Sequence, residues 1–317
     1  MTGLVLRCVG NLCRVLLDGD GGECDALVKG NLRLKGIRST NPVVVGDRVE
    51  LQPTREDLEH PYYITAICPR RNYIIRKASN LSKESHILAA NIDVALLVVT
   101  MIQPETSFTF VDRFLATAEA YDIPVVLLFN KIDLYGEEEN RRLAEWQSIY
   151  APLGYPTLSI SVTEGIGLEE VWPHIAGRIV LLSGHSGVGK SSLINALLPG
   201  SSLRTHSISL AHGTGMHTTT YSAMIPLAAE RGGGYLIDSP GIKGFGTFNM
   251  EPEELTSYFR EIFKYSKSCR FNNCTHTHEP GCAVRKAVEE HYIAESRYNS
   301  YLSMLEDKDE NKYREAF

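Results

Sequence analysis

The sequence predicts a multidomain protein with a small N-terminal β-barrel, a central α/β domain on a mostly parallel sheet, and a helical C-terminal domain. Three observations lead to this prediction. Residues 1–70 contain short β-rich segments separated by Gly, Asp, Asn or Pro. The central domain, residues 71–246, shows alternating strand and helix patterns from about residue 90. Residues 247–317 are rich in helix patterns and contain a cluster of cysteines and histidines.

The first 70 residues show short strand patterns without a helix pattern between them. These patterns cover residues 4–10, 11–18, 23–30, 47–53 and 62–69. Several short strands in so small a segment favour a barrel, and an oligonucleotide-binding (OB) barrel is one option. The segment 29–38 has four basic residues, Lys29, Arg33, Lys35 and Arg38, and no acidic one. We expect it to be a basic loop that contacts RNA, with a merely solvated loop as the alternative.

The middle of the chain alternates between strand and helix patterns. Strand patterns cover 91–100, 123–129, 156–160, 179–182, 221–227 and 234–237, and helix patterns cover 110–121, 138–150, 168–176 and a segment from Lys190. This alternation predicts a doubly wound, largely parallel sheet. The longest apolar run, 94–102, is shorter than the roughly 18–20 residues that a membrane helix needs.

Composition and charge limit the kind of protein. The chain of 317 residues is 43% hydrophobic and 22% charged, which is typical of a soluble globular protein of two or three domains. A net charge of −6 argues against a protein that coats nucleic acid with its whole surface. The net charge is +3 over residues 1–80, −6 over 81–246 and −3 over 247–317. Contact with an acidic polymer should therefore begin at the N-terminal end.

The first residues lack the pattern of a secretory signal, so we expect a cytoplasmic protein. In that compartment the seven cysteines are better explained as thiols or metal ligands than as disulfides. Four of them, Cys8, Cys13, Cys24 and Cys68, lie in strand patterns and should be small core residues. Nothing in the sequence suggests an obligate oligomer, and we expect a monomer.

The most specific motif is Gly184-His-Ser-Gly-Val-Gly-Lys-Ser191, which matches the phosphate-loop pattern G-x-x-x-x-G-K-S/T. A strand pattern precedes it and a helix pattern follows, which disfavours an ordinary Gly-rich turn. The glycines let backbone N–H groups surround a phosphate. Lys190 should bridge the β- and γ-phosphates, and the Ser191 hydroxyl should bind Mg²⁺. The predicted binding residues are Gly184, His185, Ser186, Gly187, Val188, Gly189, Lys190, Ser191 and Ser192.

A second motif, Asn130-Lys131-Ile132-Asp133, follows the strand pattern 123–129. The carboxylate of Asp133 can accept hydrogen bonds from both N1–H and N2–H₂ of guanine, and adenine offers no such donor pair. Ser161 and the N–H of Val162, after the strand pattern 156–160, should support the base. The alternative is a solvated loop of charged residues. The position at a strand end favours guanine binding, because ligands gather there in α/β sheets.

The third motif, Asp238-Ser-Pro-Gly241, follows the strand pattern 234–237. Asp238 should reach Mg²⁺ through water, and the N–H of Gly241 should meet the γ-phosphate. The order of the motifs is unusual. The guanine motif comes first, Ser161 second, the phosphate loop third and Asp238 last, while each motif still follows its own strand. This order results when the old ends of a GTPase domain are joined and the domain is opened after D-x-x-G.

With these motifs in this order, the chain resembles the RsgA family, the circularly permuted GTPases of small-ribosomal-subunit assembly. The resemblance covers nearly the whole chain. It implies an OB barrel at the front, a zinc domain at the back, and a GTPase that the small subunit activates and that acts late in the maturation of that subunit. His185 stands where the family commonly has Gln, and Met216 where it often has a basic or polar residue.

A Gly/Thr-rich segment, 212–220, lies between the phosphate loop and Asp238. Thr219, or alternatively Thr218 or Thr220, should bind Mg²⁺ when the γ-phosphate is present. Ile242 follows the D-x-x-G motif, and its side chain cannot orient the attacking water. His217 is the nearest candidate for that catalytic role by sequence, and the resemblance points to the same histidine. The alternative is an exposed histidine in a plain loop.

The C-terminal cluster combines three cysteines and one histidine within 14 residues: Cys269, Cys274, His276 and Cys282. Three thiolates and an imidazole suit tetrahedral Zn²⁺, and four protein ligands leave no open position, so the site should be structural. The same spacing is the zinc pattern of the resembling family. His278 is an alternative to His276, and unrelated thiols are the alternative to a metal site.

Three functions compete on this evidence. The leading one is a GTP hydrolase that binds the small ribosomal subunit and its rRNA and assists late maturation, with Mg²⁺ and one structural Zn²⁺. The second is a GTP-dependent RNA-binding docking module with negligible turnover, which Ile242 keeps open. The third is an adenine-nucleotide enzyme, which Asn130 and Asp133 argue against.

Overall fold

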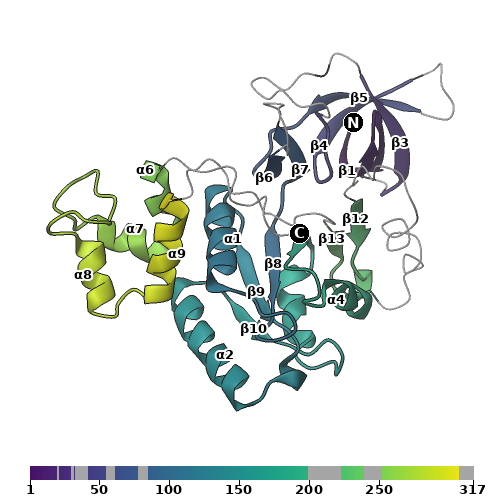
Figure 1. Cartoon of the computed structure of the whole chain (residues 1–317). Helices are drawn as coiled ribbons and strands as arrows, with labels where there is room; N and C mark the ends of the chain where they lie inside the picture. Colours follow the sequence, from purple (N-terminus) through teal and green to yellow (C-terminus); the bar gives the residue numbers. More distant parts are fainter. Residues whose placement is uncertain are drawn as a thin grey trace, which may run out of the picture.

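The computed structural model describes residues 1–19, 21–29, 32, 42–54, 61–77, 85–198, 223–238 and 252–306. Its N-terminal β-rich part, its central α/β part and its C-terminal helical part follow one another along the chain (Figure 1). In the part that is described, no helix combines the length and apolar character required to cross a membrane.

The N-terminal part is a closed barrel. Its strands are β1 (Thr2–Val9), β2 (Leu12–Leu17), β3 (Glu23–Val28), β4 (Arg48–Pro53) and β5 (Tyr62–Ile67). They pair in the order β1–β2–β3–β5–β4, and β4 pairs with β1 to close the barrel. Side chains alternate between inside and outside, as the buried Cys13, Val15 and Leu17 of β2 show. The predicted small β-barrel is confirmed, and the structure gives it five strands.

Two cysteines of the barrel depart from the prediction. Cys8 and Cys13 face each other across the β1–β2 pair and form a disulfide, whereas the sequence analysis expected free core thiols. The cause is the tight hairpin, which places the two residues directly opposite one another. Cys24 is a free, buried thiol in the barrel core, as expected, and Cys68 is free and half-buried.

A hairpin that the sequence analysis did not predict connects the barrel to the central sheet. It consists of β6 (Tyr73–Lys77) and β7 (Ser85–Ala90) and lies between the barrel and β8 in Figure 1. Ala89 forms a bridge with Val45 of the barrel. Nearby, Arg70 and Asp47 form a buried ion pair with an N–O distance of 2.6 Å. The connection is therefore well packed on its barrel side.

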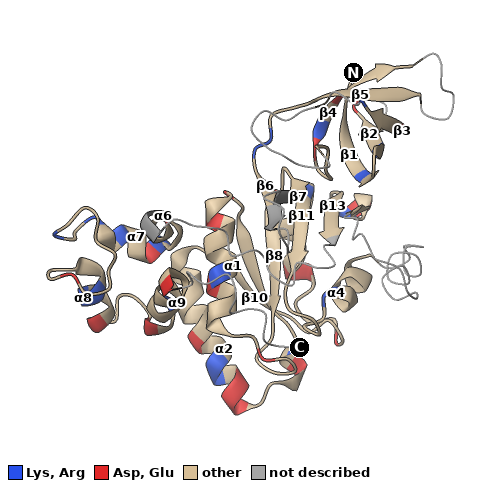
Figure 2. Cartoon of the chain, turned by 45° about the horizontal axis from the view of Figure 1, so that its top comes forward, with Lys and Arg blue, Asp and Glu red and all other residues tan. Residues whose placement is uncertain are grey.

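The central sheet is largely parallel, as predicted. Its strands are β8 (Val94–Val99), β9 (Val125–Phe129), β10 (Thr157–Ser159), β11 (Arg178–Ser183), β12 (Ala223–Pro226) and β13 (Gly234–Asp238). The order is β10–β9–β8–β11–β13 with parallel pairing, and β12 joins β13 antiparallel. β12 also pairs with β1 at Ala223 and Arg7, so the sheet continues into the barrel. Every side chain of β8 is buried and apolar, and Figure 2 shows this strand without charged residues.

Helices cover the two faces of this sheet. They are α1 (Phe108–Ala120), α2 (Glu137–Tyr150), α3 (Trp172–Ile175) and α4 (Lys190–Leu197), with the 3-10 helices η1 (Ile132–Leu134), η2 (Ala151–Leu153), η3 (Glu169–Val171) and η5 (Ala229–Arg231). The helix predicted over 168–176 is instead a 3-10 turn followed by one short helix, with Pro173 near its start. Acidic and basic side chains share the solvent face of α2, which lies at the edge of the molecule in Figure 2.

The C-terminal part consists of short helices around one longer helix. They are α6 (Pro252–Leu255), η6 (Thr256–Tyr258), α7 (Arg260–Ser266), α8 (Ala283–Glu289) and α9 (Glu295–Glu306). α9 packs along α1 of the central part (Figure 1). Ala116 of α1 belongs to the same apolar cluster as Phe259, Ile262 and Tyr301. The two parts therefore share a hydrophobic core.

Candidate nucleotide site and metal centre

The predicted nucleotide-binding residues gather at the carboxyl edge of the parallel strands. β9 ends directly before Asn130, β10 ends two residues before Ser161, and β11 ends directly before Gly184. In the sheet β10 lies beside β9, and β8 alone separates β9 from β11. Because the carboxyl ends of parallel strands meet at one edge, three motifs far apart in the sequence lie together.

The phosphate loop needs its glycines for shape and for space. Gly184, Gly187 and Gly189 have φ values of 141°, 84° and 103°, which disfavour other residues. A Cβ on Gly184 would lie 2.4 Å from the carbonyl oxygen of Val98. A Cβ on Gly189 would lie 2.3 Å from Nδ2 of Asn130. The backbone is thus folded tightly against the strand ends, with Gly189 as the N-cap of α4.

Lys190, the first residue of α4, folds its side chain back over the loop. Its Nζ donates to the carbonyl oxygens of Gly184 at 2.6 Å and His185 at 2.5 Å. These carbonyls hold the ammonium group at the loop, in the region where a phosphate would bind. A phosphate offers charged acceptors that bind an ammonium group more strongly than neutral carbonyls do.

Asn130 connects the phosphate loop to the base-binding loop. Its side chain is almost fully buried, with 2% exposed. Nδ2 donates to the carbonyl of Val188 at 2.8 Å, and Oδ1 accepts from the N–H of Val162 at 3.2 Å. A single amide side chain therefore fixes two loops relative to each other.

Asp133 is oriented by the loop that follows β10. The hydroxyl of the buried Ser161 donates to Oδ1 of Asp133 at 2.5 Å, and the same hydroxyl accepts from the N–H of Glu164 at 3.2 Å. Lys131 adopts a left-handed backbone conformation with φ of 67° and contacts the carbonyl of Gln103. The carboxylate is thereby held beside Ser161 at the sheet edge, where the sequence predicted the guanine contact.

Tyr135 and the loop that leads from β8 to α1 also belong to this site, and the sequence analysis missed both. The Tyr135 hydroxyl donates to the carbonyl of Asn130 at 2.7 Å and accepts from the N–H of Met101 at 3.0 Å. Burial raises the pKa of Tyr135, which keeps the phenol protonated. Pro104 of the same loop faces Gly187, whose Cβ position lies 3.4 Å from it. No sequence signal links these segments, because their contacts are long-range.

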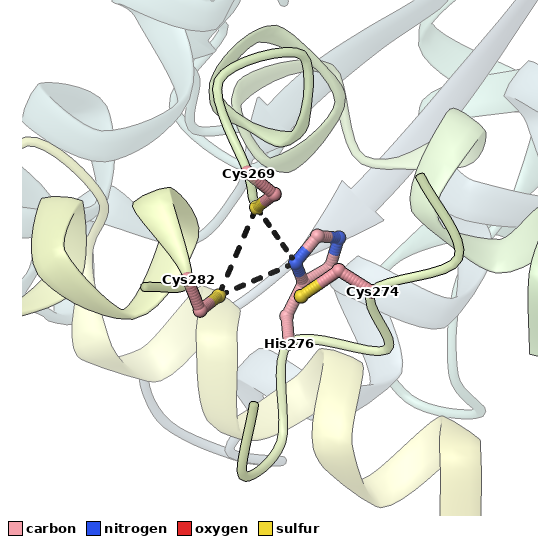
Figure 3. Close-up of side chains that lie close together, drawn as sticks. All are labelled: Cys269, Cys274, His276 and Cys282. Atoms are coloured by element: carbon pink, nitrogen blue, oxygen red, sulfur yellow. Dashed lines mark hydrogen bonds between the residues drawn. The ribbon is translucent and has the colours of Figure 1, made fainter. Parts of the chain in front are cut away.

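The Cys/His cluster forms a compact four-ligand group (Figure 3). One ligand atom from each of Cys269, Cys274, His276 and Cys282 lies within 4.8 Å of all the others. Sγ of Cys269 is 3.9 Å from Sγ of Cys282, and Nδ1 of His276 is 3.6 Å and 3.5 Å from these two sulfurs. Zn–S bonds of about 2.3 Å in a tetrahedron fit such separations, so this group could hold one Zn²⁺. His278, the alternative ligand, is exposed and contacts Thr277 instead.

Burial makes the thiols of this group weaker acids. It raises the pKa of the Cys274 thiol to about 12 and raises the pKa of Cys282 above its usual value. These thiols therefore keep their protons at neutral pH unless a metal ion replaces them. The donor set of three thiols and one imidazole fits zinc.

The loop that carries His276 is held by Glu279, which the sequence analysis also missed. The Glu279 carboxylate accepts from the N–H groups of Thr275 at 2.7 Å, Thr277 at 3.0 Å and His278 at 3.2 Å. The Tyr298 hydroxyl of α9 donates to the carbonyl of His276 at 2.5 Å. These bonds hold His276 in a left-handed conformation with φ of 62°. The metal centre is thus tied to α9.

Known proteins establish the family. The RsgA GTPase family model matches residues 67–248. "Small ribosomal subunit biogenesis GTPase RsgA" of Bacteroides fragilis is 58% identical over 317 residues, and a protein of the same name from Porphyromonas gingivalis is 57% identical, each with full coverage of both chains. This chain belongs to the RsgA GTPase family. The fold class predicted from the sequence is confirmed together with the family.

Solved structures agree with membership of the RsgA family. YjeQ from Thermotoga maritima is 34% identical with a TM-score of 0.77, and the match covers 96% of both chains. YloQ, a circularly permuted GTPase, is 28% identical with a TM-score of 0.74 and covers 96% of this chain and 93% of its own. The order of motifs along the present sequence is the permuted one.

Several predicted RsgA-type site residues lie outside the described part of the structure. Asp238 ends β13, where its backbone pairs in register with Leu182 of β11. Gly241, Ile242, His217, Thr219, Arg33, Lys35 and Arg38 lie outside the described residues, whereas Lys29 follows β3 within them. Their predicted roles at Mg²⁺, the attacking water and RNA are carried forward as proposals.

Proposed function

We propose that this protein hydrolyses GTP on the small ribosomal subunit and assists its late maturation, with its nucleotide state coupled to rRNA binding. One observation carries the proposal: the guanine motif, the Ser161 loop and the phosphate loop converge at one sheet edge although their order is permuted. Relatives that match the whole chain are named small ribosomal subunit biogenesis GTPases, which supports the choice of partner.

Guanine recognition is assigned to the two loops joined by Asn130. The Asp133 carboxylate would accept from N1–H and N2–H₂ of the base, and Ser161 already holds it through the 2.5 Å hydrogen bond. The N–H of Val162 would face the O6 atom of guanine. ATP lacks this donor pair, so selectivity for GTP follows from the chemistry of Asp133.

Phosphate binding is assigned to the loop 184–191 and to the start of α4. Lys190 would leave the carbonyls of Gly184 and His185 and pair with the β- and γ-phosphates. Mg²⁺ supplies charge compensation at the phosphates when bound, and the hydroxyls of Ser191 and Thr219 would hold it, with Asp238 reaching it through water. We assign the orientation of the attacking water to His217, and the sensing of the γ-phosphate to the N–H of Gly241.

The C-terminal cluster would hold one structural Zn²⁺ through Cys269, Cys274, His276 and Cys282. All four ligands come from the protein, which leaves no open coordination position for a substrate. We assign the ion to stabilising the helical domain that packs against α1. The predicted domains 1–70, 71–246 and 247–317 then correspond to RNA contact, nucleotide hydrolysis and metal-supported docking.

RNA contact is assigned to the barrel. Five-stranded barrels of this topology bind oligonucleotides through their exposed faces and loops. Lys29, Arg33, Lys35 and Arg38 would neutralise rRNA phosphates from the segment that follows β3. We propose that the protein acts as a monomer in the cytoplasm, where small subunits mature.

Sedimentation with ribosomal subunits tests the proposal. We expect purified protein with a non-hydrolysable GTP analogue to pellet with small subunits and not with large ones, and to be released when GDP replaces the analogue. The Lys190→Ala variant should lose this dependence on nucleotide, because it loses the phosphate contact. Equal pelleting with GDP, with the analogue and without nucleotide would overturn the coupling of nucleotide state to subunit binding.

A further inference from the structure

Phe110 at the beginning of α1 contacts the phosphate loop through His185. The ring centroids of the two side chains are 3.6 Å apart, at an interplanar angle of 31°. His185 is the second residue of the loop, and its carbonyl also accepts from Lys190. The nucleotide motifs themselves do not require an aromatic residue at position 110, which lies before the guanine motif and 75 positions from His185.

The loop has several supports, and they differ in what happens when a nucleotide binds. Lys190 holds Gly184 and His185, Asn130 holds Val188, and Pro104 lies against Gly187. In the binding mode proposed above, Lys190 leaves these carbonyls for the phosphates. The contact of Phe110 with His185, the bond of Asn130 to Val188 and the close approach of Gly184 to the Val98 carbonyl do not depend on Lys190. Of these, the contact with Phe110 is the one made by the His185 side chain.

Holding this end of the loop matters because ordering the loop costs conformational entropy. Its three glycines have the largest conformational freedom to lose, and all three adopt positive φ values. If the loop is already ordered before the ligand binds, this entropy loss no longer weakens the binding affinity. An aromatic contact at one end reduces that cost without occupying the phosphate position.

The helix that carries Phe110 is itself firmly anchored. Phe108 stacks on Trp146 of α2 with ring centroids 4.1 Å apart. One turn further on, Asp112 is buried and bonded to Tyr150 and Arg297. The ring of Phe110 therefore projects from a rigid support, so it can restrict the loop rather than move with it.

We propose that Phe110 is a positioning residue for GTP and GDP binding, which holds the phosphate loop in its binding conformation through the contact of its ring with the imidazole of His185. The inference rests on the proposed function, because it needs a guanine nucleotide at this loop. Burial, and then the charge of Lys190, lower the pKa of His185, so the stacked imidazole is neutral at neutral pH. A neutral ring can stack on Phe110 without the hydration that a charged one demands.

The test compares nucleotide affinity among matched variants. A fluorescent GDP analogue is titrated into the wild type and into Phe110→Leu, which keeps an apolar side chain but removes the ring. We expect binding to weaken by about two- to tenfold, the range for one aromatic pair. His185→Ala should weaken binding to a similar degree, and the double variant by no more than either single one. Phe110→Tyr keeps an aromatic ring and should bind the GDP analogue with the affinity of the wild type.

Two further measurements separate positioning from general damage. Tyr265→Leu removes a ring from the C-terminal helical part, where it packs against Tyr292, so it should lower the melting temperature and leave GDP affinity unchanged. In Phe110→Leu the KM for GTP should rise while kcat stays within about twofold, because a loop ordered by bound nucleotide needs no further support. Hydrogen exchange of the 184–189 peptide should accelerate in the nucleotide-free variant.

The outcomes decide between the proposals. Unchanged GDP affinity in Phe110→Leu, or additive losses in the double variant, would overturn the role of Phe110 while the wild type still binds GDP. Failure of the wild type to bind GDP would instead overturn the proposed function itself, and this inference with it.

Discussion

Arg297 on α9 donates a hydrogen bond of 2.8 Å to Asp112 on α1, and both side chains are buried. Two other nitrogens of the same guanidinium, Nε and Nη2, donate to the two carboxylate oxygens of Glu261 at 2.6 Å and 3.1 Å. Tyr150 of α2 donates to the same oxygen of Asp112 at 2.7 Å. An ionic network thus connects the C-terminal helical part to α1 and α2 of the central part, where α9 packs against α1.

Breaking this network should destabilise the protein strongly. Arg297→Met leaves Asp112 and Glu261 without their shared partner in a buried site, and we expect a loss of about 3–5 kcal/mol in the free energy of unfolding. Urea unfolding followed by tryptophan fluorescence measures it. Arg141→Met is the control, since its pair with Glu138 is exposed on α2 and should contribute nothing measurable. Equal midpoints for the two variants would contradict this account of the interface.

Gly189→Ala should abolish nucleotide binding. The new Cβ would lie 2.3 Å from Nδ2 of Asn130 at a φ of 103°, so the loop must shift away from its support. Gly165→Ala is the matched control, because Gly165 also has a positive φ, of 69°, but has nothing within 4 Å of its Cβ position. It should cost about 1–2 kcal/mol of stability and keep GDP binding. Calorimetric titration with GDP distinguishes the two, and wild-type affinity in Gly189→Ala would refute the packing argument.

Asp133→Asn should reduce GTP affinity by about 10- to 100-fold, because it removes a charged acceptor of two hydrogen bonds. The hydrogen bond from Ser161 would remain available to the amide oxygen, so the fold should be unaffected. Competition between GTP and ATP for the labelled nucleotide gives the affinities, and circular dichroism gives the fold. If GTP kept its advantage over ATP in the variant, guanine recognition would have to reside elsewhere.

Glu279→Gln should loosen the metal centre. The charged carboxylate accepts three N–H groups of the loop around His276, and a neutral amide accepts them more weakly. Substitution of such supporting residues typically lowers metal affinity by about tenfold or more, which competition with a chelating dye measures. Glu295→Gln, on the exposed start of α9, is the control. Equal zinc retention in both variants would show that the loop needs no carboxylate.

Because of Glu279, the stability of the protein should depend on pH in the acid range. Partial burial raises the pKa of Glu279, but hydrogen bonds from Thr275 and neighbouring N–H groups outweigh it and lower the pKa to about 2. A lowered pKa in the folded state means that the stabilisation is present above the usual value near 4.5 and is lost as the pH falls toward 2. The difference in stability between wild type and Glu279→Gln should therefore shrink across this window in acid titrations.

Much of the architecture was predictable because it depends on local patterns. The alternation of apolar residues in the barrel strands, the fully apolar run of β8 and the phosphate loop between a strand and a helix are all visible in short windows of sequence. The cysteine spacing likewise anticipated the ligand cluster. The hairpin β6–β7 was missed because it lacks a clear alternating pattern.

What escaped prediction depends on contacts between distant segments. Tyr135 meets Met101, Phe110 meets His185, and Arg297 meets Asp112, across separations that no short window of sequence records. The disulfide was missed for another reason. Reduced cysteines were expected because cytoplasmic proteins rarely contain disulfides, whereas the β1–β2 hairpin places Cys8 and Cys13 opposite each other. The pairing of the two strands therefore determines whether these cysteines can form a disulfide.

The central claim is that this is a GTPase whose activity depends on the small ribosomal subunit. The most direct test measures phosphate release from GTP by purified protein alone, with small subunits, and with large subunits, using His217→Ala as the catalytic variant. We predict slow release alone, strong stimulation by small subunits only, and loss of that stimulation in the variant. A slow rate that small subunits do not change, with GTP still bound, would contradict the claim and indicate a docking module instead.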